Sequence, residues 1–439
     1  MNLKIRSKEF YTRQNKELKR YFHKNKKILH IFTNETKVLN IFDEKNIDLL
    51  VLDKESNDLN KLSSIENELY DLIIITDLFE ISENIYELLQ LINSKLVSNG
   101  KVLISTINPK WKYIINFFEK LKLKNSIRKS SNTKLKKIVS LGRSCGFELN
   151  YFYTKQIFPF KVFGIGSYLN KALELILFKF NLGIKSYILF SKISNYNNEL
   201  SKTIIVPAKN ESKNLDLLFG DFPKISSLSE VILICGSSTD NTFEEAVRVS
   251  KKYKDLKIKV IQQKSDGKAG AVFEALNYTF GDLIAILDSD MSVDPNTLLS
   301  FFEIIEGGQS DFVNGTRFIY PIEDKSMRFQ NKIGNFIFRF LVSIVIQNKL
   351  SDTLCGTKVF RKSHIKKILE WRKDLNYLDP FGDFDFLFSA AYCGEKIVEY
   401  PVHYKARVYG ETQIRRYRDG FKLIIYFLKS FSRFNSSLN

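Results

Sequence analysis

The stretch LIAILDSD (residues 283–290) combines a short apolar run with two carboxylates one residue apart. An apolar run of this length, ended by polar residues, is typical of a buried strand. Asp288 and Asp290, placed where such a strand ends, can together hold a hard divalent cation, either Mg²⁺ or Mn²⁺. The cation would offset the charge that develops on a departing diphosphate. A D-x-D tripeptide is also common in polar turns, so its surroundings decide between the two interpretations.

The surrounding sequence repeats the strand pattern. The runs TIIVPA (203–208), EVILIC (230–235) and KIKVIQQ (257–263) have the apolar character of strands. Segments with helical spacing lie between them, among them NTFEEAVRVSKKY (241–253) and KAGAVFEALNYTF (268–280). Alternating strands and helices predict a parallel sheet with helices on both faces and with ligands at the carboxyl ends of its strands.

Polar residues follow each of these strands. Lys268 stands beside small residues at a helix start, where backbone N–H groups and an ammonium suit a diphosphate. Asp240 lies in the sequence GSSTDNT, which can begin a helix. Pro207, Asn210 and Glu211 stand where the first strand ends and suit a nucleotide base or ribose. Each of the five also fits an ordinary turn or cap, but their placement after successive strands favours a substrate-binding edge.

Further motifs complete this half of the chain. In order they are IIVPAKNES, SSTDNTFEEA, GKAGAVFEAL, GDLIAILDSDMSVDP, NGTRF, SDTLCGTKVFRK, PFGDFDFLF and YPVHYKARVYGETQIRRYRDG. Together they make residues 203–430 resemble a family 2 glycosyltransferase of the branch close to dolichol-phosphate mannosyltransferases. The resemblance implies a nucleotide-diphospho-sugar-binding (GT-A) fold, inversion at the anomeric carbon, the D-x-D metal site and a substrate-binding Arg317 in NGTRF. The family usually has an acidic pair after the second strand; here Cys235 and Gly236 stand there, which leaves the nucleotide base open.

The sequence GDFDF (382–386) resembles the acidic acceptor-side motif of the same family. By that resemblance Asp383 is the catalytic base that deprotonates an acceptor hydroxyl, and Asp385 is a supporting catalytic carboxylate. Both can equally be carboxylates at the start of a helix. A lipid-phosphate acceptor is already anionic and needs no base.

The last part of the chain combines cations with apolar residues. Arg415, Arg416 and Arg418 can present guanidinium groups to phosphate oxygens, so we predict that they bind substrate. The following FKLIIYFLKSF has an apolar stripe with flanking cations, as expected of a helix at a membrane interface. The segment 331–350 is similarly apolar. Either segment can also be an ordinary core helix.

The first half has the same alternation in a weaker form. KKILHIF, DLLVLD, YDLIIITDLF and GKVLISTI read as strands, and ENIYELLQLINSKL reads as a helix. This half resembles a class I methyltransferase domain, with Asp53 where that family places a ribose-binding acid. ILHIFTNET (28–36) lacks the glycines that let a backbone approach the cofactor, so S-adenosylmethionine binding is not expected. We read residues 151–190 as a connection or cap of the sheet.

Length and composition bear on the number of domains, the binding partners and the cellular location. The 439 residues suggest two domains, which we place at 1–190 and 203–439 with a linker at 191–202. The net charge of +18 suits a solvated surface or an anionic membrane rather than nucleic acid. Four scattered cysteines, a polar N-terminus and the lack of a long apolar run indicate a cytoplasmic protein without disulfides, signal peptide or spanning helix.

We therefore expect an α/β protein with two doubly wound domains, an N-terminal Rossmann-like domain of methyltransferase type and a C-terminal GT-A domain. The expected activity is metal-dependent, inverting transfer of a sugar from a nucleotide-diphosphate donor to a polyprenyl-phosphate-like acceptor, at the inner face of the cell membrane. The alternative is a bifunctional methyltransferase–glycosyltransferase in surface glycan synthesis, with a saccharide hydroxyl as acceptor and Asp383 as base.

Overall fold

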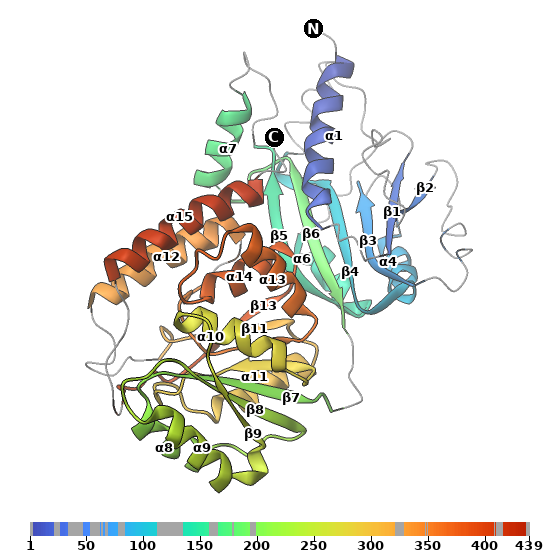
Figure 1. Ribbon diagram of the computed structural model, residues 1–439. Helices are drawn as coiled ribbons and strands as arrows, with labels where there is room; N and C mark the ends of the chain where they lie inside the picture. The colour runs from blue at the N-terminus through green and yellow to red at the C-terminus, as the bar shows by residue number, and fades with distance from the viewer. Residues whose placement is uncertain are drawn as a thin grey trace. The chain divides into compact units, whose positions relative to one another are not determined.

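The structure is a computed structural model of the 439-residue chain (Figure 1). The chain forms two compact units that divide between residues 194 and 195. Each unit has its own sheet and its own core, and each is described by itself below. The residues described are 3–21, 27–33, 47–52, 62, 65, 69–77, 84–111, 135–157, 166–177, 180–193, 199–320, 329–346, 348, 350–407, 409 and 416–435.

The second unit is built on a seven-stranded sheet with the order β13-β11-β12-β10-β7-β8-β9. Only β12 runs antiparallel to its neighbours β10 and β11, so the other six strands point the same way. Their carboxyl ends therefore share one edge of the sheet. The strands are β7 (Lys202–Ala208), β8 (Leu228–Cys235), β9 (Ile258–Gln262), β10 (Leu283–Ile286), β11 (Phe312–Thr316), β12 (Lys358–Arg361) and β13 (Ile397–Pro401).

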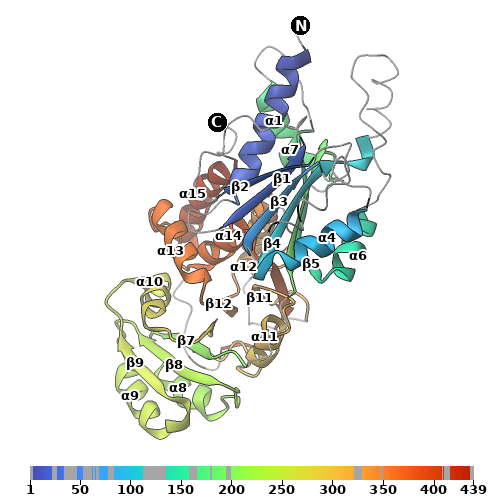
Figure 2. The ribbon, with the colours of Figure 1, turned by 90° about the vertical axis from the view of Figure 1, so that its right-hand side faces the viewer.

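Helices cover both faces of this sheet (Figures 1 and 2). Alternate residues of β10 enter opposite cores: Ile284 and Ile286 pack on one side, Leu283 and Ala285 on the other. The side of Leu283 holds α8 (Ser212–Gly220), α9 (Thr242–Lys252) and α11 (Thr297–Glu306). The side of Ile284 holds α10 (Gly267–Ala275), α12 (Phe329–Ile346), α13 (His364–Asp374), α14 (Asp383–Tyr392) and α15 (Arg416–Asn435). Short 3-10 turns lie at η5 (Lys254–Leu256) and η6 (Leu276–Tyr278).

The first unit has a six-stranded sheet with the order β2-β1-β3-β4-β6-β5. Strands β1 to β4 pair in parallel, and β6 runs antiparallel between β4 and β5. The strands are β1 (Ile28–Thr33), β2 (Ile47–Leu52), β3 (Tyr70–Thr76), β4 (Leu96–Ile107), β5 (Phe147–Lys155) and β6 (Lys185–Lys192). The helices are α1 (Leu3–Lys19), α4 (Ile85–Ser94), α6 (Leu135–Ser144) and α7 (Gly166–Leu177), with a 3-10 turn at η2 (Pro109–Trp111).

Two cores lie on the two faces of this first sheet. Leu88 and Leu89 of α4 and Ile138 of α6 pack in one of them. Leu18 of α1 and the adjoining Tyr21 pack with the strands in the other. The unit is therefore a mixed α/β layer with helices on both sides, whereas the methyltransferase type stays a prediction.

The predicted strands and helices of the first unit match β1 to β4 and α4, but the interpretation of residues 151–190 was wrong. That region contains most of β5, which begins at Phe147, and β6 up to Phe190, with α7 between them. In β5 (FELNYFYTK) polar residues stand between the aromatic ones, and in β6 (KSYILFSK) a buried run of four residues, YILF, is flanked by lysines and serines; neither segment was predicted as a strand. The predicted linker begins inside β6, which ends at Lys192, and ends at Lys202, where β7 begins.

Candidate functional site

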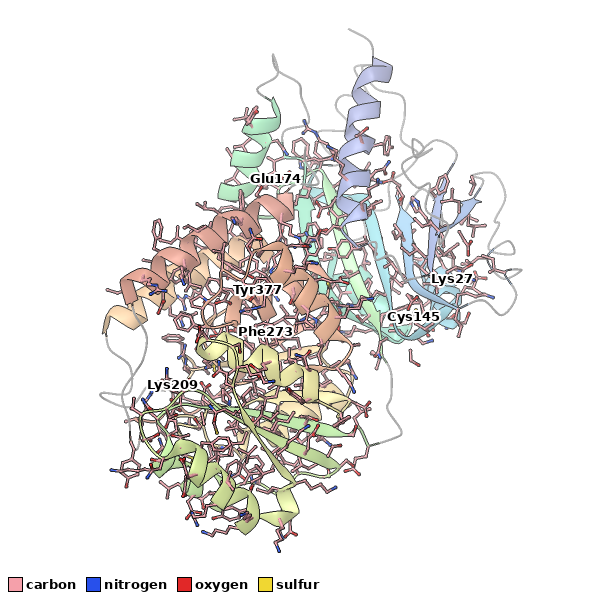
Figure 3. All side chains as sticks on the ribbon, in the orientation of Figure 1. Lys27, Cys145, Glu174, Lys209, Phe273 and Tyr377 are labelled. Carbon is pink, nitrogen blue, oxygen red and sulfur yellow. The ribbon has the colours of Figure 1, made fainter. Side chains whose placement is uncertain are left out.

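Polar side chains gather at the edge where β7, β8, β9 and β10 end. Asp288 and Asp290 follow β10, which pairs with β7 on one side and with antiparallel β12 on the other. Lys209 follows β7 and Phe273 lies on α10, and Figure 3 labels both near this edge. The polar residues that follow these strands in the sequence therefore lie at one edge of the sheet.

The first charged pair joins Lys268 to Asp288. Lys268 Nζ lies 2.5 Å from Asp288 Oδ1, and both side chains stay partly accessible. Burial lowers the pKa of Lys268, but the Asp288 and Asp383 carboxylates raise it by more, so the ammonium keeps its charge. Gly356 makes room for the pair, because a Cβ there would overlap Asp288 Oδ2 and lie 2.8 Å from Lys268 Nζ.

The second pair joins Asp290 to Arg407. Arg407 Nη2 lies 3.1 Å from Asp290 Oδ2, and Oδ1 accepts a 3.0 Å hydrogen bond from the backbone N–H of Ser292. The segment carrying Arg407 is fixed to the same loop, since Lys405 N–H donates to Ser292 O at 2.9 Å. Sequence reasoning missed Arg407, although it stands in the quoted run YKARVYGET.

The third pair joins Lys358 to Asp383. Lys358, the first residue of β12, is fully buried, and its Nζ lies 2.5 Å from Asp383 Oδ1. Asp383 begins α14, where Gly382 has a left-handed φ of 85°. Asp379 Oδ2 caps this helix by accepting from the N–H groups of Phe384 (2.8 Å) and Asp385 (3.0 Å). The cap fixes the first turn of α14 and with it the Asp383 carboxylate.

Asp385, predicted as a supporting catalytic carboxylate, contacts side chains of two other helices. It is fully buried, with Arg372 Nη1 of α13 at 2.5 Å and the Tyr426 hydroxyl of α15 donating at 2.8 Å. Burial raises the pKa of Asp385 to about 7, and Asp379 adds to the rise while Arg372 opposes it. In this structure Asp385 ties α13, α14 and α15 together; a catalytic role for it stays a prediction.

Glu211 faces the charged pairs from the end of β7. Burial raises its pKa to about 7, and the Asp290 and Asp288 carboxylates add to the rise. Its N–H donates to Thr242 Oγ1 at 2.9 Å, and its side chain accepts from Asn214 Nδ2. Glu211 thus adds a fourth acidic group to Asp288, Asp290 and Asp383, and its charge is sensitive to whatever lies beside Asp288 and Asp290.

Three other residues predicted to bind the donor shape the surrounding loops. Asn210 has a left-handed φ of 57°, and its Oδ1 accepts the N–H of Thr239 at 2.8 Å. Asp240 accepts from the backbone N–H groups of Ser212 and Thr242, both at 3.2 Å, and so joins the starts of α8 and α9. The carbonyl oxygen of Pro207 accepts from Ser289 Oγ at 2.9 Å, between the two aspartates. Their contacts hold the edge in shape, and substrate contact stays a prediction for them.

The predicted arginines lie in two places. Arg317 forms a two-pronged ion pair with buried Asp352, at 2.6 Å and 2.9 Å, and its guanidinium lies 5.2 Å from the Tyr404 ring centre. Arg418 is exposed on α15. Arg416 is the first residue of α15, but its side chain is not among those described, and Arg415 lies outside the described residues.

A divalent cation is compatible with this donor set. Among the residues that the structure describes, no three His, Cys, Asp or Glu side chains are grouped to hold a metal ion by themselves. Mg²⁺ commonly takes only one or two protein carboxylates and completes its coordination with substrate phosphates and water. Asp288 and Asp290 supply carboxylate oxygens of that kind. Their ion pairs with Lys268 and Arg407 show that positive charge is stable beside both carboxylates.

Comparison with known proteins identifies the family of the second unit's first part. Residues 203–369 match the family described as "Glycosyl transferase family 2", so this part of the chain is a domain of that family. A dolichol-phosphate mannosyltransferase of Pyrococcus furiosus is 26% identical over 220 residues, 48% of this chain and 59% of that protein. A dolichyl-phosphate hexose transferase of Haloferax volcanii is 26% identical over 218 residues, 49% of this chain and 88% of that protein.

Two further comparisons are more limited in extent or likeness. A dodecaprenyl-phosphate galacturonate synthase of Rhizobium johnstonii is 29% identical over 143 residues, 32% of this chain and 40% of that protein. Glucosyl-3-phosphoglycerate synthase of Mycobacterium tuberculosis, solved with Mn²⁺, UDP-glucose and phosphoglyceric acid, is 15% identical with a TM-score of 0.42. That match covers 53% of this chain and 80% of the solved one. The family match confirms the prediction of a family 2 domain and leaves the methyltransferase resemblance as a prediction.

Proposed function

We propose that the family 2 domain makes this protein a metal-dependent, inverting glycosyltransferase that moves a sugar from a nucleotide-diphosphate donor to a polyprenyl-phosphate-like acceptor. The observation that carries the proposal is the set of three carboxylates, Asp288, Asp290 and Asp383, each paired with a cation at one sheet edge. Such an edge suits a diphosphate donor that binds together with a metal ion. The carboxylates would then pair with the metal ion, and the protein cations with the diphosphate.

The donor end of the site follows from these pairs. Asp288 and Asp290 would hold Mg²⁺ or Mn²⁺, which supplies electrostatic stabilisation of the leaving diphosphate. Lys268 and Arg407, now on the carboxylates, are the cations within reach of the phosphate oxygens that would lie there. Lys268 also stands in the first turn of α10, where backbone N–H groups favour anions.

The acceptor class is supported by an exposed apolar surface on α12 and α15. These two helices pack against each other (Figure 1). Exposed side chains recur at helical spacing on both, at Ile333, Phe336, Ile337 and Phe340 on α12 and at Phe421, Ile424 and Leu428 on α15. We call these seven side chains the apolar stripe.

Cations accompany the apolar stripe, with Arg418 and Lys429 exposed on α15 and Lys422 half-buried there. An exposed apolar surface with neighbouring cations suits the interface of an anionic membrane. None of the helices in the described ranges has the length and apolar character that crossing a membrane requires. We therefore propose peripheral attachment at the inner face of the cell membrane. A lipid-phosphate acceptor in that membrane would then reach the charged pairs at the sheet edge.

The alternative, a saccharide hydroxyl acceptor, would use Asp383 as base. Oδ1 of Asp383 is engaged by Lys358 at 2.5 Å, so Oδ2 is the oxygen that a hydroxyl would meet. The same ammonium favours an acceptor that carries its own negative charge, which is the reason for preferring the lipid phosphate. For the first unit we propose a Rossmann-like domain with a structural or docking role. Its mostly parallel sheet supports the Rossmann-like fold, and the lack of glycines in residues 28–36 is the reason for expecting no S-adenosylmethionine.

Replacing Asp290 by Asn tests the proposal. The amide is a poor ligand for Mg²⁺ or Mn²⁺, so turnover of nucleotide sugars with Mn²⁺ and a polyprenyl phosphate should fall at least about a hundredfold. Asp282→Asn is the matched control, because Asp282 immediately precedes the same strand β10 and is exposed at its opposite end. Near-normal turnover in Asp290→Asn, or an equal loss in the control, would contradict the metal site.

A further inference from the structure

If the proposed donor site holds, the strand order determines where the nucleotide base lies along this edge of the sheet. Strands β7, β8 and β9 lie on one side of β10, and β12 lies on the other. Lys358 of β12 holds Asp383, the residue proposed for the acceptor side. A donor whose diphosphate lies at Lys268 and Asp288 with its sugar toward Asp383 must extend its nucleoside the other way, over the ends of β7, β8 and β9.

Three residues meet at those ends: Lys209 after β7, Gly236 after β8 and Gln263 after β9. A Cβ added at Gly236 would lie 2.9 Å from Gln263 Oε1 and 3.5 Å from both Cβ and Cδ of Lys209. The volume that a side chain at 236 would fill is therefore bordered by the Gln263 amide and the Lys209 stem. We call this place the base end of the site.

The Gln263 amide has a fixed orientation. Its Nε2 donates to the carbonyl oxygen of Gly267 at 2.9 Å, and its backbone N–H donates to Cys235 O at 2.8 Å. A carbonyl oxygen cannot donate, so the atom facing Gly267 must be the amide nitrogen. Gln263 Oε1 is thus turned toward Gly236 as a hydrogen-bond acceptor, and one N–H of the same amide is held by the Gly267 carbonyl oxygen.

We propose that Gln263 and Lys209 read the nucleotide base and select a uridine diphosphate sugar over a guanosine diphosphate sugar. Uracil presents a single donor, N3–H, between two carbonyl acceptors. Gln263 Oε1 accepts from that N–H, and the Lys209 ammonium donates to a neighbouring carbonyl. The base end then satisfies each polar group that uracil presents to these two residues.

Guanine fits the same pair less well. Its edge carries two adjacent donors, N1–H and the N2 amine, beside one acceptor, O6. A carboxylate can accept from both donors, whereas Gln263 offers one oxygen and Gly236 offers no side chain. One guanine donor would lose its water without gaining a partner, and an unsatisfied polar group of this kind costs about tenfold in affinity.

Calorimetric titration of the full chain with UDP and GDP in the presence of Mn²⁺ tests this inference. We expect UDP to bind at least about tenfold more tightly than GDP. Gln263→Ala should weaken UDP about fivefold and shrink the preference, and Gln263→Glu, which adds a second acceptor oxygen, should shift the preference toward GDP by about tenfold. Gln309→Ala, an exposed glutamine before β11 at the opposite end of the sheet, is the control and should leave both affinities unchanged.

The outcomes distinguish a failure of the proposed function from a failure of base reading by Gln263. If neither nucleotide binds the parent protein, the proposed function itself fails. If both bind, and the preference for UDP is absent or stays the same in Gln263→Ala and Gln263→Glu, the proposed function survives and the base-reading role of Gln263 is refuted. A parent preference for GDP would also overturn it.

Discussion

Gly356→Ala should inactivate the site while leaving the fold almost unchanged. The added methyl group would overlap Asp288 Oδ2 and lie 2.8 Å from Lys268 Nζ, against an ordinary contact of 3.4 Å or more. Relief requires the Asp288 carboxylate to move by roughly 1 Å, and a misplacement of that size at a reacting centre costs about a hundredfold in rate. Both displaced groups are ends of partly exposed side chains, so the free energy of unfolding should fall by no more than about 1 kcal/mol.

Two measurements check this expectation. Sugar transfer at saturating donor reports the rate, and denaturant unfolding reports stability. Gly334→Ala is the control, because a Cβ at this position in α12 meets nothing within 4 Å, and alanine should stabilise the helix by about 0.5–1 kcal/mol at full activity. Full activity in Gly356→Ala would refute the assignment of Asp288 and Lys268 to the site, and a loss of activity explained by global unfolding would refute the geometric reasoning.

Two further predictions concern the helices behind the site. The pKa of Asp385 is raised from 3.8 to about 7, so its contribution to stability is full below about pH 4 and is lost as the pH rises through 7. In Asp385→Asn the fall in the free energy of unfolding between about pH 5 and pH 8 should shrink by about 2–3 kcal/mol, and an unchanged slope in denaturant titrations would contradict it. Phe336 and Phe421 are 60% and 65% exposed, and changing both to Ser should weaken binding to anionic vesicles at least about tenfold. The control Leu217→Ser on α8, also exposed, should bind as the parent does, and equal losses in both would show that the apolar stripe has no special part in vesicle binding.

The strands that could be predicted are those with local signals. β7, β8 and β10 are largely apolar and buried because both faces of the sheet are covered there, and their ends carry the predicted polar residues. β9 (IKVIQ) is an edge strand, in which exposed Lys259 and Gln262 stand among the apolar residues. Strand β12 has only four residues and begins with the buried Lys358, so no periodicity marks it. Polar residues likewise interrupt β5 of the first unit, whereas β6 contains the short apolar run YILF (187–190), which was not predicted as a strand.

The candidate site was predictable on its acidic side and much less so on its basic side. Asp288, Asp290 and Asp383 stand in recognisable motifs, and Lys268 stands at a helix start. The partners Lys358 and Arg407 come from distant parts of the chain and reach the edge only because β12 lies beside β10 and because Lys405 is bonded to Ser292. Contacts of that kind depend on strand order, which a single sequence does not contain.

Under the proposed function, the three ion pairs predict how the site responds to a metal ion and a diphosphate. In the resting arrangement each carboxylate already has a cation, drawn from α10, from β12 and from the segment after β13. A metal ion arriving alone would compete with Arg407 for Asp290, and a diphosphate arriving alone would meet Asp288 and Asp290 beside its own charge. With both bound, Asp288 and Asp290 would hold the metal, and Lys268 and Arg407 would pair with the phosphates in place of the carboxylates. Binding of the two should therefore be mutually favourable, and by linkage each should raise the affinity of the other by the same factor.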